Sequence, residues 1–274
     1  MASASGLLQL HSHSKDSLVT PRYSMAGRTV LVSGASSGIG EHLARLFGAA
    51  DARVVLGARR TDKTHKIANQ IKDRGGNALA VSMDVTDEDS VVAAFDAAER
   101  EFGVVDTIIA NAGVAAGGRS TDIPLKHVQR VVDTNFTGVY LTAREGAKRL
   151  IASGSREKEN GRIVIIGSIT SLLHGEGDSA YAALKAGVAH LGRNMAREWV
   201  RQGINVNTVH PGYIDTEINS DWYETAGGKE QIGAFNRRRL TDLEALDDPV
   251  LFLSSDASRM VTGSEIIVDD GQWL

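Results

Sequence analysis

The chain has 274 residues, 42% of them hydrophobic, which is enough for one large α/β domain with a substantial core. Its net charge of −4 and its lack of a long basic run argue against a nucleic-acid partner, and no apolar stretch reaches the ~18 residues that a membrane span needs. Because cysteine is absent, disulfides, thiolate catalysis and cysteine-bound metals are excluded, and we expect a cytoplasmic protein without a metal site.

Residues 1–26 differ from the rest of the chain. They are rich in serine, show no long periodic pattern, and contain an apolar run, GLLQL, that is too short for the core of a signal peptide. With Lys15 and Arg22 as their only basic residues, they also make a poor transit peptide. We predict a flexible N-terminal extension followed by one domain at residues 27–274, with a functional arm and a targeting segment left open as alternatives.

From residue 28 onward, short apolar segments alternate with amphipathic ones. The apolar segments predict strands at 28–34, 52–59, 77–85, 104–113, 161–168, 204–212 and 264–270. The amphipathic segments predict helices at 38–50, 62–74, 87–102, 124–152, 178–201 and 243–254, with a charged surface loop at 153–161 and irregular helical turns at 214–240. Strands that are apolar almost throughout are buried on both faces. Their alternation with helices predicts one doubly wound, seven-stranded parallel sheet with helices on both faces, a Rossmann-type fold.

The first strand runs into a glycine-rich turn, SGASSGIG, and then into a helix. Its glycines follow a Gly-x3-Gly-x-Gly spacing. They let the backbone approach a pyrophosphate, while the helix N-terminus supplies N–H groups and the positive end of its dipole. The residues predicted to bind the cofactor here are Gly34, Ser36, Ser37, Gly38, Ile39 and Gly40. A tight turn with a purely structural role is the alternative.

The end of the second strand bears on the choice of dinucleotide. A carboxylate at this position commonly binds the ribose hydroxyls of NAD, but the sequence reads LGARR and places Ala58 there. Arg59 and Arg60 instead offer charge that pairs well with a phosphate. We therefore expect NADP(H) to be preferred, with NAD(H) as the alternative if both arginines are solvated surface charges.

Asp84 and Val85 end the third predicted strand. The Asp84 carboxylate is placed to accept a hydrogen bond from the adenine amine of a cofactor, and we assign both residues to the cofactor site. The alternative, compatible with the first, is that Asp84 caps the helix at 87–102.

Beyond the glycine turn, a series of short motifs carries the chemistry. They are NAG at 111–113, TN at 134–135, Ser168, YAALK at 181–185, HPG at 210–212 and the C-terminal VTGSEIIVDDG. In this order and at these spacings the chain resembles the classical short-chain dehydrogenases/reductases, in their 3-oxoacyl-reductase-like ketoreductase branch. The resemblance covers residues 27–274.

The resemblance implies a set of catalytic roles. Tyr181 is the general acid in reduction and the base in oxidation, while Lys185 lowers its pKa and binds the nicotinamide ribose. This is physically sensible, because a ketone that receives hydride needs a proton, and tyrosine alone titrates near ~10. An ammonium one helical turn away stabilises the phenolate. Ser168 orients and polarises the carbonyl, and Asn135 holds a water that relays protons from Lys185.

Further cofactor contacts are also implied. The expected residues are Asn111, Ala112, Gly113, Pro211, Gly212, Ile214 and Thr216. Two positions depart from the commonest family pattern. Ser33 stands where threonine is usual and keeps a hydroxyl, whereas Ala110 stands where asparagine is usual and removes an amide that braces the sheet.

The Tyr-x3-Lys spacing goes with the interconversion of ketones and secondary alcohols in this family. The segment 214–240 corresponds to the family's mobile lid and contains Trp222, Tyr223 and Phe235. These aromatics either wall an apolar substrate pocket or serve as core and subunit contacts. The basic run at 236–240 either catches an anionic substrate or is a solvated charge run.

Two other functions stay open. A 3-oxoacyl-thioester reductase that uses a carrier protein needs basic docking residues, but Glu159 and Gln202 stand at the expected positions, which favours a small free ketone or alcohol. A non-catalytic nucleotide-binding regulatory protein would commonly lack part of the set that is intact here. The family usually forms homotetramers through its two long helices and its C-terminal strand, and we expect the same of this chain.

Overall fold

The computed structural model describes residues 23–217 and 219–274. Its seven strands form one parallel sheet in the order β3-β2-β1-β4-β5-β6-β7. They are β1 (Thr29–Ser33), β2 (Arg53–Ala58), β3 (Asn77–Ser82), β4 (Thr107–Ala110), β5 (Gly161–Ile166), β6 (Ile204–Pro211) and β7 (Glu265–Val268). The strand order reverses between β1 and β4, where a doubly wound sheet opens a crevice at its carboxyl edge. The predicted sheet is confirmed.

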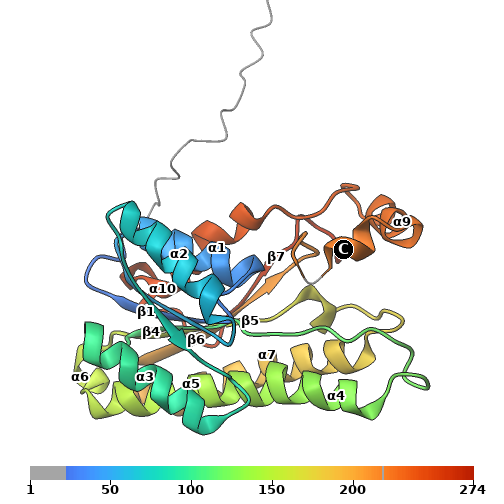
Figure 1. Ribbon diagram of the computed structural model, residues 1–274. Helices are drawn as coiled ribbons and strands as arrows, with labels where there is room; N and C mark the ends of the chain where they lie inside the picture. The colour runs from blue at the N-terminus through green and yellow to red at the C-terminus, as the bar shows by residue number, and fades with distance from the viewer. Residues whose placement is uncertain (1–22, 218) are drawn as a thin grey trace, which may run out of the picture.

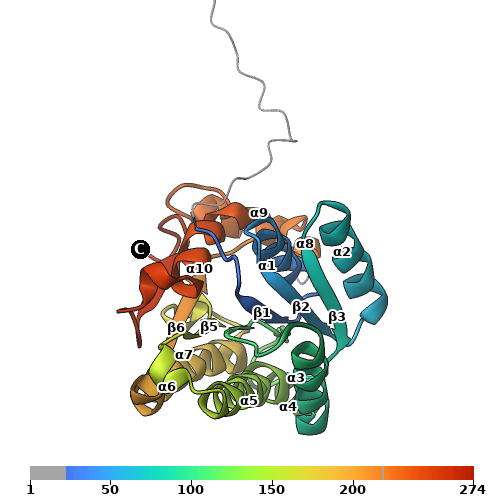
Figure 2. The same cartoon turned by 90° about the vertical axis from the view of Figure 1, so that its left-hand side faces the viewer.

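Helices cover both faces of the sheet (Figures 1 and 2). One face carries α1 (Gly38–Ala49), α2 (Thr61–Asp73) and α10 (Asp247–Ser254), and the other carries α3 (Glu88–Phe102), α4 (Leu125–Val132), α5 (Gly138–Ala152) and α7 (Ser179–Trp199). The short helices are α6 (Ser155–Lys158), α8 (Ser220–Tyr223) and α9 (Ala226–Ala234). None of the helices in the described part of the chain has the length and apolarity to cross a membrane.

Each face of the sheet has its own apolar core. Leu43, Phe47 and Leu251 pack under α1 and α10, while Phe95 and Leu150 pack under α3 and α5, all of them almost fully buried. Because both faces are covered, the strand residues are apolar in nearly every position, which is the pattern that the sequence shows. Because all the strands pair in parallel, their carboxyl ends lie together at one edge of the sheet.

The long helix predicted at 124–152 is interrupted in the middle. A five-residue π-helical turn, Asp133–Thr137, joins α4 to α5 and contains the buried Asn135. Such turns occur most often at functional sites, because they redirect one side chain out of the regular helical spacing.

The predicted boundary of the extension is a few residues too late. Residues 1–22 lie outside the described part of the chain, but Met25 is fully buried and its N–H donates to Ala50 O (2.7 Å). The Tyr23 ring contacts Phe252, with 6.2 Å between ring centroids. The domain therefore begins before residue 27, because apolar side chains of the supposed extension complete its core.

The predicted loop at 153–161 contains α6, whose ends are set by left-handed backbone at Gly154 and Glu159. Ser155 is fully buried and its hydroxyl donates to Gln202 O (2.6 Å). The exposed residues at 156–159 agree with the predicted surface loop, but the prediction missed the short helix and the buried Ser155 that anchors the segment.

Candidate active site

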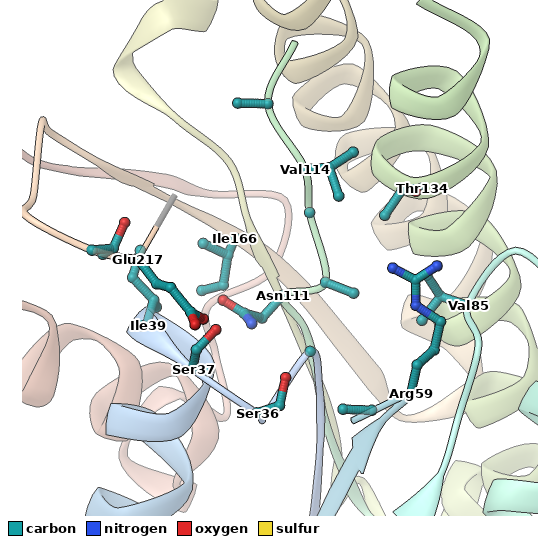
Figure 3. Close-up of a pocket in the computed structure, with 18 of the residues that line it drawn as sticks. Ser36, Ser37, Ile39, Arg59, Val85, Asn111, Val114, Thr134, Ile166 and Glu217 are labelled. Carbon is teal, nitrogen blue, oxygen red and sulfur yellow. The ribbon is translucent and has the colours of Figure 1, made fainter. Parts of the chain in front are cut away.

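A cavity of about 580 Å³ opens at the carboxyl ends of β1, β2, β4 and β5 (Figure 3). Most residues predicted to bind a cofactor line it, namely Gly34, Ser36, Ser37, Gly38, Ile39, Gly40, Arg59, Arg60, Asp84, Val85, Asn111, Ala112, Gly113, Tyr181, Lys185 and Thr216. The predicted residues outside this lining are Asn135, Ser168, Pro211, Gly212 and Ile214. The structure therefore brings residues from most of the chain to a single cleft.

The glycine turn forms one end of the cavity and leaves little room for side chains. Gly34 and Gly38 have φ angles of +70° and +54°, the left-handed region that glycine adopts without strain. A Cβ on Gly40 would lie 2.3 Å from Gly34 O and 2.5 Å from Asn111 Nδ2. The turn can therefore keep this shape only with glycine at these positions.

Ser33 ties the glycine turn to the end of β4. Its hydroxyl accepts hydrogen bonds from the backbone N–H groups of Asn111 (3.0 Å) and Ala112 (3.1 Å). In return, Asn111 Nδ2 donates to Ser33 O (2.9 Å). The serine thus supplies the hydroxyl that the family's threonine would supply, while Ala110 is buried in the strand.

Arg60 lies over the serines of the glycine turn. Its guanidinium donates to Ser36 Oγ (3.1 Å) and Ser37 Oγ (2.6 Å). It also pairs with Glu217 Oε2 (2.9 Å), and Lys63 Nζ lies 2.7 Å from Glu217 Oε1. The Arg60 side chain is therefore held in place in the cavity wall by Ser36, Ser37 and Glu217. Glu217 was not among the predicted site residues, and no local sequence pattern marks it.

Asp84 lies farther along the same wall and does not cap α3. Its Oδ1 accepts from Thr86 N (3.0 Å) and Thr86 Oγ1 (2.8 Å), whereas Asp87 is the residue whose side chain caps α3. Partial burial raises the pKa of Asp84, but the hydrogen bonds from Thr86 and the charge of Arg59, 3.8 Å away, lower it below its usual range. The alternative in which Asp84 caps α3 was wrong, because Asp87 is the capping residue. Asp84 lines the cavity instead.

Tyr181, Lys185 and Ser168 meet at the other end of the cavity. Lys185 Nζ lies 5.7 Å from the centroid of the Tyr181 ring and donates to Ile166 O (2.8 Å). Ser168 hydrogen-bonds the phenol oxygen of Tyr181. Ser168 Oγ already accepts from Thr170 N (3.2 Å) and Thr170 Oγ1 (2.9 Å), so its own O–H is the group left to donate to Tyr181.

Burial dominates the proton affinities of this cluster. It raises the pKa of Tyr181 to about 12, with only partial compensation from the Ser168 hydrogen bond. It also lowers the pKa of Lys185 to about 8. Desolvation of the phenolate sets the direction of this shift in the protein chain alone, and the expectation that Lys185 lowers the pKa of Tyr181 stays a prediction.

Asn135 lies behind the cavity wall. Its Oδ1 accepts from Val114 N (2.8 Å) and its Nδ2 donates to Val114 O (2.9 Å). The side chain thereby replaces a strand neighbour for the backbone that follows β4, and the π-helical turn aims it there. Its amide thus makes one donated and one accepted hydrogen bond, and a role in holding a water for Lys185 stays a prediction.

His210 is a buried group that the prediction noted only as part of the HPG motif. Its Nδ1 lies 3.2 Å from Ser168 N and 3.0 Å from Ser168 O, and its Nε2 lies 2.9 Å from Glu265 Oε2. Burial lowers the pKa of His210. The imidazole therefore fixes the backbone of Ser168 from the β6 side.

The aromatic residues of the predicted lid lie in different environments. Tyr223 is buried and accepts a hydrogen bond from Asn219 Nδ2 (3.1 Å), while Phe235 stacks on Tyr213 at 5.3 Å. Trp222 is 50% exposed and is not among the residues that line the cavity.

Two of the three arginines in the basic run at 236–240 share one acidic partner. Arg237 Nη1 lies 3.1 Å from Asp270 Oδ1, and Arg239 Nε lies 2.7 Å from Asp270 Oδ2. Because one carboxylate faces two arginines, the run keeps a net positive charge, and its role as an anion site or as a solvated charge run stays a prediction.

Known proteins resemble this chain over nearly its whole length. A family model described as short chain dehydrogenase matches residues 28–227. A cis-4-hydroxycyclohexanecarboxylate dehydrogenase from Sinomonas cyclohexanicum is 38% identical over 90% of this chain and 96% of its own. An L-rhamnose 1-dehydrogenase (NAD(P)(+)) from Azotobacter vinelandii is 34% identical over 90% of this chain and 97% of its own.

Solved structures agree with these sequence matches. A short-chain type dehydrogenase/reductase from Mycobacterium marinum has a TM-score of 0.85 and 34% identity, over 93% of this chain and 99% of its own. A gluconate 5-dehydrogenase from Burkholderia cenocepacia, solved in complex with NADP and tartrate, has a TM-score of 0.86 and 30% identity, over 92% of this chain and 98% of its own. The chain belongs to the short-chain dehydrogenase/reductase family of oxidoreductases.

Proposed function

We propose that the protein interconverts a small ketone and the corresponding secondary alcohol with NADP(H), using Tyr181 as its general acid and base. The observation that carries this proposal is the cluster of Tyr181, Ser168 and Lys185 at one end of the cavity. The other end of the cavity is the glycine turn, whose serine side chains are contacted by Arg60. Neither end alone requires redox chemistry, but a dinucleotide that spans both would bring its reactive ring to the tyrosine.

The cavity suits such a cofactor. Its volume of about 580 Å³ lies within the range of cofactor sites. The glycine turn and the start of α1 would hold the pyrophosphate, Asp84 would face the adenine, and Arg59 and Arg60 would face an adenosine 2′-phosphate. The family binds a nicotinamide cofactor, and the basic side chains support NADP(H) as the preferred form.

When bound, the nicotinamide supplies hydride in reduction and accepts it in oxidation. The protein's own task is to place the carbonyl and to move one proton. The O–H of Ser168, which faces the Tyr181 phenol in this structure, would turn to the carbonyl oxygen of a substrate. The Tyr181 O–H would donate to the same oxygen as negative charge develops on it.

Lys185 stabilises the tyrosinate that proton donation leaves behind. Its pKa of about 8 means that it is mostly an ammonium at pH 7, at 5.7 Å from the Tyr181 ring. Its hydrogen bond to Ile166 O keeps it in this place. In the chain without cofactor, Tyr181 keeps its proton up to about pH 12. Near neutral pH its phenol is therefore in the protonated form that can donate to a carbonyl oxygen, which is the form that reduction needs.

We infer that the substrate is a free cyclic or sugar-like alcohol or ketone. Proteins similar to this chain carry the names of dehydrogenases for a hydroxycyclohexanecarboxylate, rhamnose and gluconate. The test is the initial rate of NADPH and of NADH oxidation with cyclic ketones, keto sugars and 3-oxoacyl thioesters. Turnover of a free ketone with NADPH supports the proposal, whereas turnover of thioesters alone would contradict the substrate class.

We also propose a homotetramer built on α5, α7 and β7, the elements that the family uses. Large apolar side chains are exposed on α5 and β7, with Tyr140 at 40%, Ile151 at 42% and Ile267 at 38%. Apolar groups left on these elements are the kind that a subunit interface covers.

A further inference from the structure

Glu217 lies on the mouth of the cavity, in the segment between β6 and α8 (Figure 3). Its carboxylate is held by two cations from the far side of the glycine turn, Arg60 at 2.9 Å and Lys63 at 2.7 Å. Arg60 in turn holds Ser36 and Ser37. The Glu217 carboxylate therefore already occupies the basic corner of the cavity, the part made positive by Arg60 and Lys63.

The charge of this corner is nearly balanced by the protein itself. Hydrogen bonds from Lys63, Ser37 and Arg60 lower the pKa of Glu217 to about 2, so its carboxylate is ionised at every working pH. Arg59 likewise has Asp84 beside it, at 3.8 Å. A phosphate that enters this corner meets an Arg60 guanidinium that already donates to Ser36, Glu217 and Ser37, and a carboxylate that repels it.

We propose that Glu217 occupies the place of the adenosine 2′-phosphate and competes with it for Arg60 and Lys63, so that Glu217 sets the selectivity between NADP(H) and NAD(H). This inference rests on the proposed use of a nicotinamide dinucleotide. Binding of NADP(H) has to displace the carboxylate, whereas NAD(H), which has hydroxyls there, leaves the contact between Glu217 and α2 in place. The chain then binds both cofactors with a smaller preference than its arginines alone would give.

A different role for the same carboxylate would have a different signature. An acid beside the adenosine ribose can accept hydrogen bonds from the 2′- and 3′-hydroxyls and so favour NAD(H) directly. In that case removal of its charge weakens NAD(H), while in our proposal removal of its charge strengthens NADP(H) and leaves NAD(H) almost unchanged.

The test is the dissociation constant of NADP⁺, NAD⁺, 2′,5′-ADP and 5′-AMP, measured by titration calorimetry at one ionic strength. The variants are Glu217→Gln, which keeps the shape of the side chain, and Glu224→Gln, a matched control on an exposed lid glutamate that has Lys229 at 3.8 Å. The 2′,5′-ADP and 5′-AMP pair isolates the phosphate, because neither contains a nicotinamide.

For Glu217→Gln we expect NADP⁺ and 2′,5′-ADP to bind about fivefold more tightly, the size that loss of two exposed charge pairs suggests. NAD⁺ and 5′-AMP should change less than about twofold, and the control variant should match the wild type. An unchanged ratio of NADP⁺ to NAD⁺ affinity, or a loss of NAD⁺ affinity, would overturn the inference while leaving the proposed function intact. Failure of both dinucleotides to bind the wild type would refute the proposed function and the inference with it.

Discussion

Lys185 makes the stability of the protein depend on pH in a predictable direction. The residue is 4% exposed, and burial lowers its pKa from 10.5 to about 8. Because the unfolded chain binds this proton more tightly than the folded chain, folding releases a proton between about pH 8 and pH 10.5. The free energy of unfolding therefore rises with pH across this window and is flat below it. At about 1.4 kcal/mol per pH unit, the full rise is about 3 kcal/mol.

The assay is urea unfolding from pH 7 to pH 10 of the wild type, Lys185→Met and Lys66→Met. Lys66 is an exposed residue of α2 and serves as the matched control. Other titrating groups are common to all three proteins and cancel in the difference. The wild type should gain about 2 to 3 kcal/mol over Lys185→Met between pH 7 and pH 10, and Lys66→Met should follow the wild type. A difference that stays flat over this range would refute the assignment of Lys185 as a buried ammonium.

Other features of the site give further predictions. Gly40→Ala should abolish dinucleotide binding and lower the melting temperature, because its Cβ would meet Gly34 O at 2.3 Å; calorimetry and thermal unfolding check both, and unaltered binding would contradict the close packing of the turn. The kcat/KM for ketone reduction should be constant below pH 8 and fall above it as Lys185 loses its proton while Tyr181 keeps its own; a rise above pH 8 would oppose the assigned roles. Light scattering should give the mass of a tetramer, and a monomer mass would exclude the proposed α5, α7 and β7 interface.

Much of this structure could be predicted because the informative residues are local in sequence. Apolar strands alternate with amphipathic helices, and a glycine turn follows the first strand. These patterns place Gly34 at the carboxyl edge of a parallel sheet without any knowledge of tertiary contacts, whereas the place of Tyr181 and Lys185 beside it was implied by the resemblance to the family. The spacing of Tyr181 and Lys185 also predicts their shared helix face, which the 5.7 Å contact confirms.

What escaped prediction depends on contacts between distant parts of the chain. Glu217 meets Arg60 and Lys63 across more than 150 positions, and His210 meets Glu265 on a neighbouring strand, so no local pattern reveals either pair. The pKa of Tyr181 depends on how completely the folded chain removes water from it, which spacing alone does not determine. The start of the domain was misplaced because Met25 is buried by residues far along the chain.

The most direct test of Tyr181 as the general acid is the rate of NADPH oxidation with a ketone that the wild type turns over, measured in Tyr181→Phe beside Tyr140→Phe. Tyr140 is 40% exposed on α5 and serves as the matched control. We expect Tyr181→Phe to lose at least about 10³-fold in kcat, since the general acid is gone, while the dissociation constant of NADP⁺ changes less than about twofold. Retention of kcat within about tenfold of the wild type would contradict the assignment of Tyr181 as the proton donor.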